Sequence, residues 1–164
     1  MKTLNNYIQE ALIKKDTKLK EYYFQPTSFK ELRSLIEQLL NERGKNADLN
    51  DIDVSKVTEF YQPYTSIFDG LDPHNIDISQ WNVSRVRDMT GLFYNCKNFN
   101  CDLSQWKVNN VELMQSMFEG CEKFKGEGLE NWKPIKCTPP ELMLNIFKNS
   151  GVKKYPSWYK ECRR

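Results

Sequence analysis

The sequence predicts an α/β fold: a short solenoid with a repeat of 25 residues and an α-helical cap on its N-terminal side. The first observation behind this prediction is that residues 78–89 recur, with changes, as residues 103–114, and a fixed period of this size is typical of stacked arrays. The second is that the apolar spacing changes from an extended to a helical pattern within each repeat. The third is an amphipathic helix pattern just before the repeats.

The clearest single element is the helix expected over residues 28–43. Ser28-Phe29-Lys30-Glu31 matches a capping box, in which the serine hydroxyl and the glutamate carboxylate each satisfy a free backbone N–H. An apolar stripe follows at helical spacing, and Gly44 supplies the stop signal. Because a stacked array exposes an apolar end unless something covers it, we expect this helix to be the N-terminal cap.

Each repeat is expected to form a short strand followed by a short helix. Residues 78–86 are rich in β-branched and aromatic side chains, which favour an extended segment. Met89, Leu92, Phe93 and Cys96 then follow at the spacing of one helical face. Weaker copies lie on both sides of the two good ones, so the repeats are expected to span residues 48–150. Stacked strands would form a parallel sheet and the short helices a second layer.

The pattern D-I-S-x-W-x-V-S-x-V-x-x-M-x-x-L/M-F, carried by residues 77–93 and with small changes by residues 102–118, resembles the BspA-type leucine-rich repeat of bacterial surface proteins. The resemblance covers residues 48–150 and implies a leucine-rich-repeat-like solenoid. It implies adhesion or binding in only a general way, because the family is defined by its scaffold. Residues 1–11 contain several polar side chains and do not match a secretion signal.

The chain is expected to contain four segments. Residues 1–24 form an N-terminal amphipathic helix and basic linker, 25–47 the helical cap, 48–150 the repeats, and 151–164 a C-terminal cap and basic tail. The formal charge of +2 is uneven: residues 48–124 carry −6, whereas residues 1–47 carry +3 and residues 125–164 carry +5. An acidic repeat array argues against a nucleic-acid partner. No apolar stretch is long enough to span a membrane.

Residue types that carry catalysis or bind metals are sparse. His74 is the single histidine and the five cysteines form no CxxC pair, so neither a zinc site nor a nucleophile with its base is expected. We therefore expect no enzymatic activity and no cofactor. Cys96 and Cys121 share one repeat position and are expected to pack as small apolar side chains. Asp77 and Asp102 share another and are expected to accept from turn N–H groups.

Polar residues between the inward positions of the strands are expected to form columns that run across the repeats on the outer surface. The candidate partner-binding residues are Asp51, Gln80 and Gln105 in one column, Asp53, Asn82 and Lys107 in the next, and Lys56, Arg85 and Asn110 in the third. This surface suits a protein or glycan partner through hydrogen bonds, or it is simply a solvated face. The aromatic segment Tyr155–Tyr159 is either a second contact surface or a cap on the last repeat.

These features predict a non-catalytic protein–protein interaction module with an unidentified protein partner and an undetermined oligomeric state. The expected location is intracellular, in the cytoplasm, or within a phage particle. The resemblance to BspA-type repeats leaves open a surface adhesion protein that binds a host protein or a glycan. That alternative is opposed by the missing secretion signal.

A third possibility comes from the N-terminus. Residues 1–11 resemble the capsid-targeting peptides of tailed phages, which a prohead protease cuts after the glutamate of a Leu/Ile-x-Glu motif, here Ile8-Gln9-Glu10. This resemblance implies a packaged internal head protein, processed after Glu10 so that Ala11 becomes the new N-terminus.

Overall fold

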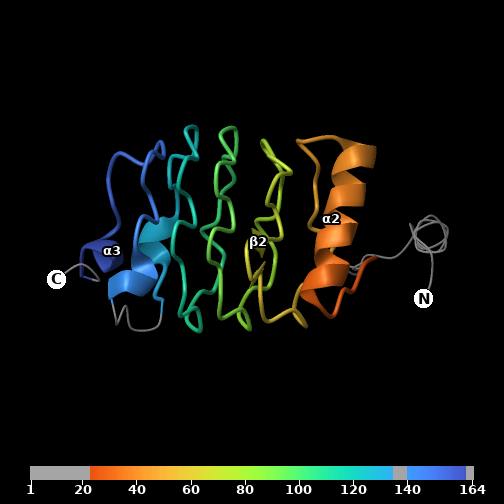
Figure 1. Cartoon of the computed structure of the whole chain (residues 1–164), viewed down its shortest axis with the longest axis horizontal. Coiled ribbons are helices and arrows are strands. Elements are labelled where there is room, and N and C mark those ends of the chain that lie inside the picture. Colours follow the sequence, from red (N-terminus) through yellow and green to blue (C-terminus); the bar gives the residue numbers. More distant parts are fainter. Residues whose placement is uncertain (1–22, 135–139, 162–164) are drawn as a thin grey trace.

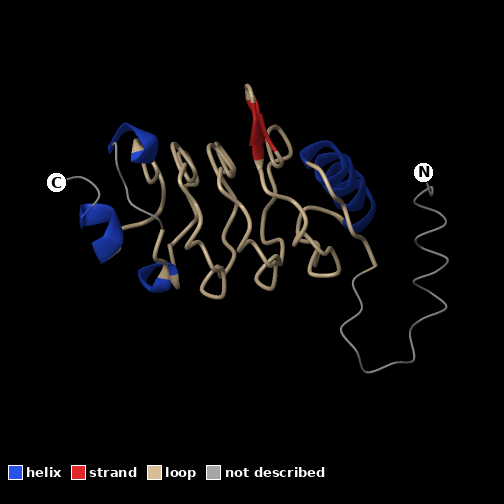
Figure 2. Cartoon of the chain, turned by 90° about the horizontal axis from the view of Figure 1, so that it is seen from below, coloured by secondary structure: helices blue, strands red, loops and turns tan. Residues whose placement is uncertain are grey.

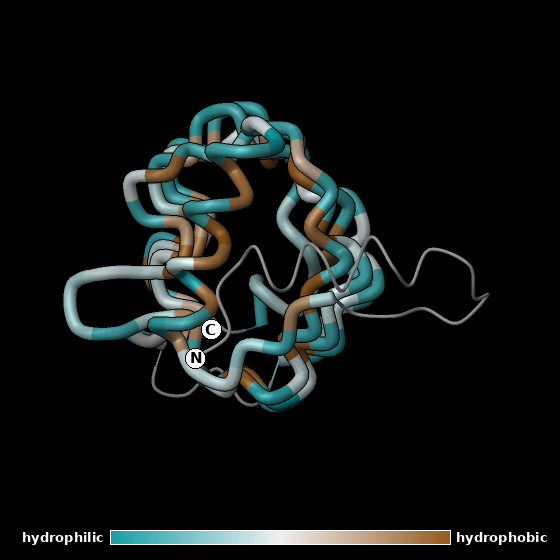
Figure 3. The backbone as a smooth tube through the Cα atoms, turned by 90° about the vertical axis from the view of Figure 1, so that its right-hand side faces the viewer, coloured by the Kyte–Doolittle hydropathy of each residue, from teal (hydrophilic) through white to brown (hydrophobic). Residues whose placement is uncertain are grey.

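The computed structural model describes residues 23–134 and 140–161, in which short elements flank a long run of turns. Its elements are the helix α2 (Phe29–Arg43), the strands β1 (Tyr61–Gln62) and β2 (Thr65–Ser66), the 3-10 helices η1 (Leu129–Asn131) and η2 (Pro140–Met143), and the helix α3 (Ser157–Glu161). From α2 onward the chain winds in coils that lie side by side in sequence order (Figure 1). Viewed along the stack, successive coils follow nearly the same outline (Figure 3).

Helix α2 begins and ends where its capping signals stand. The Ser28 hydroxyl accepts from the Glu31 N–H at 3.3 Å, and the Glu31 carboxylate accepts from the N–H of Thr27 at 2.8 Å, one residue earlier than the capping box predicts. Gly44 adopts a φ of 84° and its N–H donates to the Leu40 carbonyl at 3.0 Å. The helix lies against the first coil at one end of the stack (Figure 1), with five apolar side chains buried: Phe29, Leu32, Ile36, Leu39 and Leu40.

The coils are built from consecutive tight turns. In the coil that starts at residue 78, the N–H groups of five buried residues donate to the carbonyl three positions earlier, at 3.0 to 3.2 Å: Trp81, Val86, Leu92, Cys96 and Phe99. The residues at both ends of each of these turns are buried. A spacing of three residues between inward side chains therefore serves a turn as well as it serves a helix.

This local structure differs from the strand and short helix expected in each repeat. Within residues 48–128 the structure has no helix, and the only named strands are β1 and β2, an antiparallel hairpin that projects from the stack (Figure 2). The segment expected to be helical is interrupted by Gly91 and Asn95, which adopt left-handed φ values of 56° and 57°. Their N–H groups donate sideways to the next coil instead of along a helix, to the carbonyls of Gln115 and Glu119 at 2.8 Å each.

Neighbouring coils touch through isolated parallel bridges, and no continuous parallel sheet forms in the described residues. The bridges join Asp48 with Asp77, Glu59 with Asp88, and Asp88 with Leu113. A parallel bridge at the same repeat position in successive coils keeps the sequence repeats in register along the stack.

Four tryptophans form a ladder through the core. The rings of Trp81, Trp106, Trp132 and Trp158 stack in that order with centroids 6.3 to 6.5 Å apart. Each indole N–H donates to a backbone carbonyl of the preceding coil at 2.7 to 3.0 Å, namely those of Leu49, Ile78, Leu103 and Leu129. Trp158 therefore continues the repeat beyond residue 150, inside the segment expected to be only a cap and tail.

The three cysteines in the described part of the coils are buried. Cys96 and Cys121 occupy one position in adjacent coils, in line with the expectation that they pack as small apolar side chains, and Cys101 is buried too. Burial raises the pKa of the Cys96 thiol to about 12 and that of the Cys101 thiol to about 11, because the apolar surroundings disfavour a thiolate. These thiols are held in their protonated form at neutral pH.

Candidate functional site

The three predicted columns lie at turn corners of the coils and not on the face of a sheet. Seven of the nine side chains are exposed, and Asp51 and Asp53 are half-buried. Two hydrogen bonds join neighbouring coils beside these columns: the N–H of Gln80 donates to the Asn50 amide oxygen at 2.9 Å, and the Asn110 amide donates to the Ser84 carbonyl at 2.7 Å. The predicted residues therefore lie on neighbouring coils of the stack, and their role in binding a partner stays a prediction.

Several of these side chains are occupied in shaping the turns. The side-chain oxygens of Asp53 and Asn82 accept from the backbone N–H two residues later, at 2.9 and 3.2 Å. Asp77 and Asp102 make the same contact at 3.0 and 2.8 Å, as predicted from their repeat position. These side chains fix the backbone conformation of the turns. Their replacement would therefore change the outer surface by moving the turn backbone as well as by removing the side chain.

Asp51 is held by the cap. Both guanidinium nitrogens of Arg43 donate to its carboxylate, at 2.8 and 3.0 Å. This contact raises the pKa of the Arg43 guanidinium, because the hydrogen-bonded carboxylate favours the charged form. Asp51 thus links α2 to the first coil and is not available to a partner.

Three basic side chains of the columns remain exposed. Lys56, Arg85 and Lys107 have no carboxylate within ion-pair distance in the part of the chain that the structure describes. By contrast, the nearby Arg87 pairs with Glu112 at 3.1 Å. The three side chains, with the exposed Gln105, form what we call the basic corner, on coils whose sequence is otherwise acidic.

The N-terminal end of the stack is closed by α2 and by one arginine that the sequence does not single out. Arg33 reaches from α2 to the coil that follows β2, and its guanidinium donates to the carbonyls of Ser66, Ile67 and Asp69 at 2.8, 3.2 and 2.7 Å. The carbonyls of Ile67 and Asp69, which accept from no backbone N–H in the described residues, are thereby satisfied by a cation, and that of Ser66 also accepts from the Asp69 N–H.

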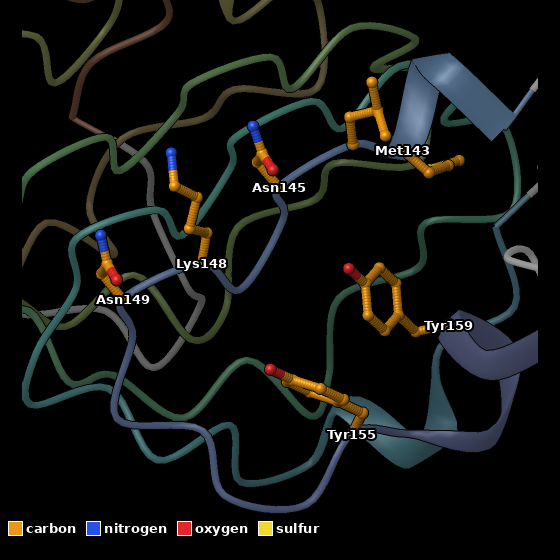
Figure 4. Close-up of a pocket in the computed structure, with 7 residues that line it drawn as sticks. Met143, Asn145, Lys148, Asn149, Tyr155 and Tyr159 are labelled. Carbon is orange, nitrogen blue, oxygen red and sulfur yellow. The ribbon is translucent and has the colours of Figure 1, made fainter.

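The C-terminal end carries a cleft of about 430 Å³. The chain bends around it so that two tyrosines face a row of polar residues, and Figure 4 labels Met143, Asn145, Lys148, Asn149, Tyr155 and Tyr159. The rings of Tyr155 and Tyr159 also pack on Phe147, with centroids 5.6 and 5.0 Å away. The predicted aromatic segment therefore both covers the end of the core and forms one wall of a cleft.

Asn145 and Asn149 are not among the residues predicted from the sequence. Both adopt left-handed φ values, 57° and 55°, at the positions that Gly91 and Asn95 occupy in an earlier coil. The recurrence of glycine or asparagine at a fixed repeat position is the signal that could have found them, because these two residue types adopt left-handed conformations most readily.

The described residues hold no group of three or more metal-binding side chains, and none of their helices is long and apolar enough to cross a membrane. His74 lies 3.7 Å from the Asp72 carboxylate on a half-exposed turn. Glu10 and Ala11 lie outside the described residues, so processing there stays a prediction.

Comparisons with curated proteins and with solved structures each give no match. A family model matches residues 30–158, which run from α2 through the coils to the last tryptophan of the ladder. The chain therefore belongs to the family described as "Mycoplasma protein of unknown function, DUF285".

Proposed function

We propose that this chain is a non-catalytic protein–protein interaction module, built on a short solenoid of leucine-rich-repeat type in which turns replace the expected helices. The apolar residue types of each coil are occupied in stacking, and the polar ones are presented at repeated corners. The resemblance to BspA-type repeats supports the same class. Repeat arrays of this kind contact partners over an extended outer surface.

The observation that carries the proposal is the basic corner. Lys56, Arg85 and Lys107 project from coils whose backbone is fixed by lateral bonds, and they have no ion-pair partner in the described residues. Unpaired cations held on rigid turns attract an acidic protein surface, and the attraction acts on association rate and register. A polyanion such as nucleic acid fits less well, because residues 48–124 carry a net charge of −6.

The absence of a catalytic arrangement within the described ranges is consistent with a binding role. The buried thiols have raised pKa values, which suppresses the thiolate that a nucleophile needs. His74, the one histidine, pairs only loosely with Asp72 and faces solvent. We propose no cofactor.

The test is a site-specific photocrosslinking experiment in the native cells. A photoreactive residue replaces Gln105 in the basic corner, and in a matched control it replaces the exposed Glu130 of η1. We expect one protein to crosslink from position 105 and not from position 130. The variant pair Arg85→Glu and Lys107→Glu should weaken binding of that protein, purified, by about tenfold for each charge.

Equal crosslinking from both positions, or full affinity in the charge-reversed variant, would exclude the basic corner as the contact surface. Nothing in the described residues favours the alternatives of a packaged phage head protein or a surface adhesin. Mass spectrometry of the N-terminus of the native protein tests the first of these separately, since processing would leave Ala11 at the N-terminus.

A further inference from the structure

One wall of the stack carries a lateral ladder of backbone hydrogen bonds with a single polarity. Between the first two coils of this ladder, the N–H groups of Gly91, Phe93 and Asn95 donate to the carbonyls of Gln115, Met117 and Glu119. Between the second coil and the third, the N–H groups of Ser116, Phe118 and Gly120 donate to the carbonyls of Leu144, Ile146 and Lys148. Every donor in this ladder points toward the C-terminal end of the stack, and every acceptor points toward the N-terminal end.

The ladder stops at the C-terminal cleft. The repeat places the next three donors at Asn145, Phe147 and Asn149, and no acceptor for their N–H groups exists among residues 23–134 and 140–161. Asn145 and Asn149 are exposed and line the cleft. Figure 4 shows them in a row on one wall, with Lys148 between them. Phe147 is buried, so a ligand reaches the two asparagine N–H groups first.

The opposite end of the same wall shows what the fold does with unpaired backbone groups. There the carbonyls of Ser66, Ile67 and Asp69 accept from the guanidinium of Arg33, a charged donor. Aligned N–H groups at the other end form a positive edge that favours an acceptor, and a negatively charged one above all. Lysines also outnumber glutamates by four to two between residues 140 and 161.

We propose that the C-terminal cleft binds an acidic segment of a partner protein, whose backbone carbonyls accept from the N–H groups of Asn145 and Asn149. The spacing comes from the molecule itself, because the acceptors of Ser116 and Gly120 are carbonyls four residues apart on one chain, those of Leu144 and Lys148. The stretch between these carbonyls turns at Asn145, whose own carbonyl accepts from the Lys148 N–H, so an added segment would repeat this geometry as one more turned coil edge.

The walls of the cleft suit such a segment. Leu144 and Tyr155 are 44% and 40% exposed, which gives apolar contacts to the bound segment. A second copy of this chain fits poorly, since its own acceptor edge is already bonded to Arg33 behind α2. The cleft lies at the end of the stack, so this proposal is independent of the basic corner on its side.

The test uses amide hydrogen exchange and chemical shifts of the full-length chain, with a capped peptide of alternating Glu and Val as the probe. In the free chain we expect the amides of Asn145 and Asn149 to exchange at least about tenfold faster than those of Ser116 and Gly120, their bonded counterparts. The peptide should slow both exposed amides by about tenfold and shift their resonances. Glutarate, a free dicarboxylate, should do neither at the same concentration.

Two variants make the result specific. Leu144→Glu places a negative charge in the cleft and should weaken peptide binding by about tenfold. Tyr64→Glu makes the same change of charge at the exposed tip of the β1–β2 hairpin and should leave binding unchanged. Equal affinity of both variants, or equal shifts with glutarate, would overturn the peptide assignment. Slow exchange of Asn145 and Asn149 in the free monomer, or only in a self-associated form, would show that the chain or a second copy covers the edge.

Discussion

The two ends of the stack are closed in different ways. At the N-terminal end α2 buries an apolar stripe, Arg33 donates to the otherwise unpaired carbonyls of Ile67 and Asp69, and Arg43 binds Asp51 with two nitrogens. At the C-terminal end the rings of Tyr155 and Tyr159 cover Phe147, but the N–H groups of the wall beside them have no acceptor in the described residues.

This difference separates two requirements of a stacked fold. The apolar core has to be covered at both ends, because an exposed core costs stability and invites aggregation. The backbone ladder has to be terminated as well, and here only its carbonyl end is terminated by the chain described. The N-terminal end is thus expected to matter for stability and the C-terminal end for binding.

The largest expected contrast comes from one substitution made at both ends. Leu32 of α2 is fully buried, so Leu32→Ala should lower the free energy of unfolding by about 2 to 5 kcal/mol through lost burial and a cavity. Leu144 at the cleft is largely exposed, and Leu144→Ala should change it by no more than about 0.5 kcal/mol. Urea denaturation measures both, and similar losses would show that the C-terminal end is as tightly closed as the other.

The tryptophan ladder gives the next contrast, between the interior of the stack and its last coil. Trp132→Phe keeps an aromatic ring but removes one of the two donors to the buried Leu103 carbonyl, which still accepts from the Trp106 N–H, at a cost of about 0.5 to 1.5 kcal/mol. Trp158→Phe removes the equivalent bond to the Leu129 carbonyl. Among the described residues the Trp158 ring stacks on one tryptophan only, so this substitution should lower the free energy of unfolding by less than Trp132→Phe does. Thermal unfolding of the two variants gives the order, and a greater loss at Trp158 would contradict it.

Arg33 tests whether the carbonyl end needs its cation. Arg33→Met keeps much of the side-chain volume and removes all three bonds to carbonyls, so it should cost about 1 to 2 kcal/mol. Arg33→Lys keeps the charge but cannot fork to several carbonyls, and it should lie between wild type and Arg33→Met. If both variants unfold like the wild type, water satisfies these carbonyls equally well and the two ends differ less than proposed.

The sequence predicts the repeat well and its local conformation poorly. The register follows from residues that recur in the core, such as Trp81 and Trp106, whose place in the ladder depends only on being apolar and periodic. The expected helix after Met89 fails because inward residues three apart suit a tight turn equally well. The left-handed φ values of Gly91 and Asn95 select tight turns over a helix at this point. At the equivalent Ser116, which also adopts a left-handed φ, the residue type does not predict this conformation.

The candidate sites divide in the same way. The columns of Gln80 and Arg85 are predicted because exposure follows from register. The unpaired N–H groups of Asn145 and Asn149 are not, since the direction of a backbone N–H depends on the local turn and on whether another coil follows. Arg33 is missed for a related reason: its partners are carbonyls, which no side-chain pattern reveals.

The smallest expected effect lies between the two ends, in the buried thiols. The pKa of Cys96 rises from an ordinary value near 9 to about 12 in the folded chain, so the folded state keeps a proton that the unfolded state releases. The stability from this group is therefore complete below about pH 9 and is lost as pH rises toward about 12. Between neutral pH and about pH 9.5 Cys96 alone should contribute a loss of about 0.8 kcal/mol, measured by urea denaturation as the difference between the wild type and a variant without this thiol.

Cys96→Val tests this assignment because it removes the titrating thiol while keeping an apolar side chain of similar size. The variant should lose less stability than the wild type over the same alkaline range. Cys101→Val is the matched comparison: the pKa of Cys101 is raised to about 11, so up to about pH 9.5 its removal should flatten the profile about as much as the removal of Cys96, and the two variants should differ only above about pH 11. An unchanged pH profile in Cys96→Val would mean that the coil opens to water at this position before its thiol ionises, and the middle of the stack would then resemble its open end.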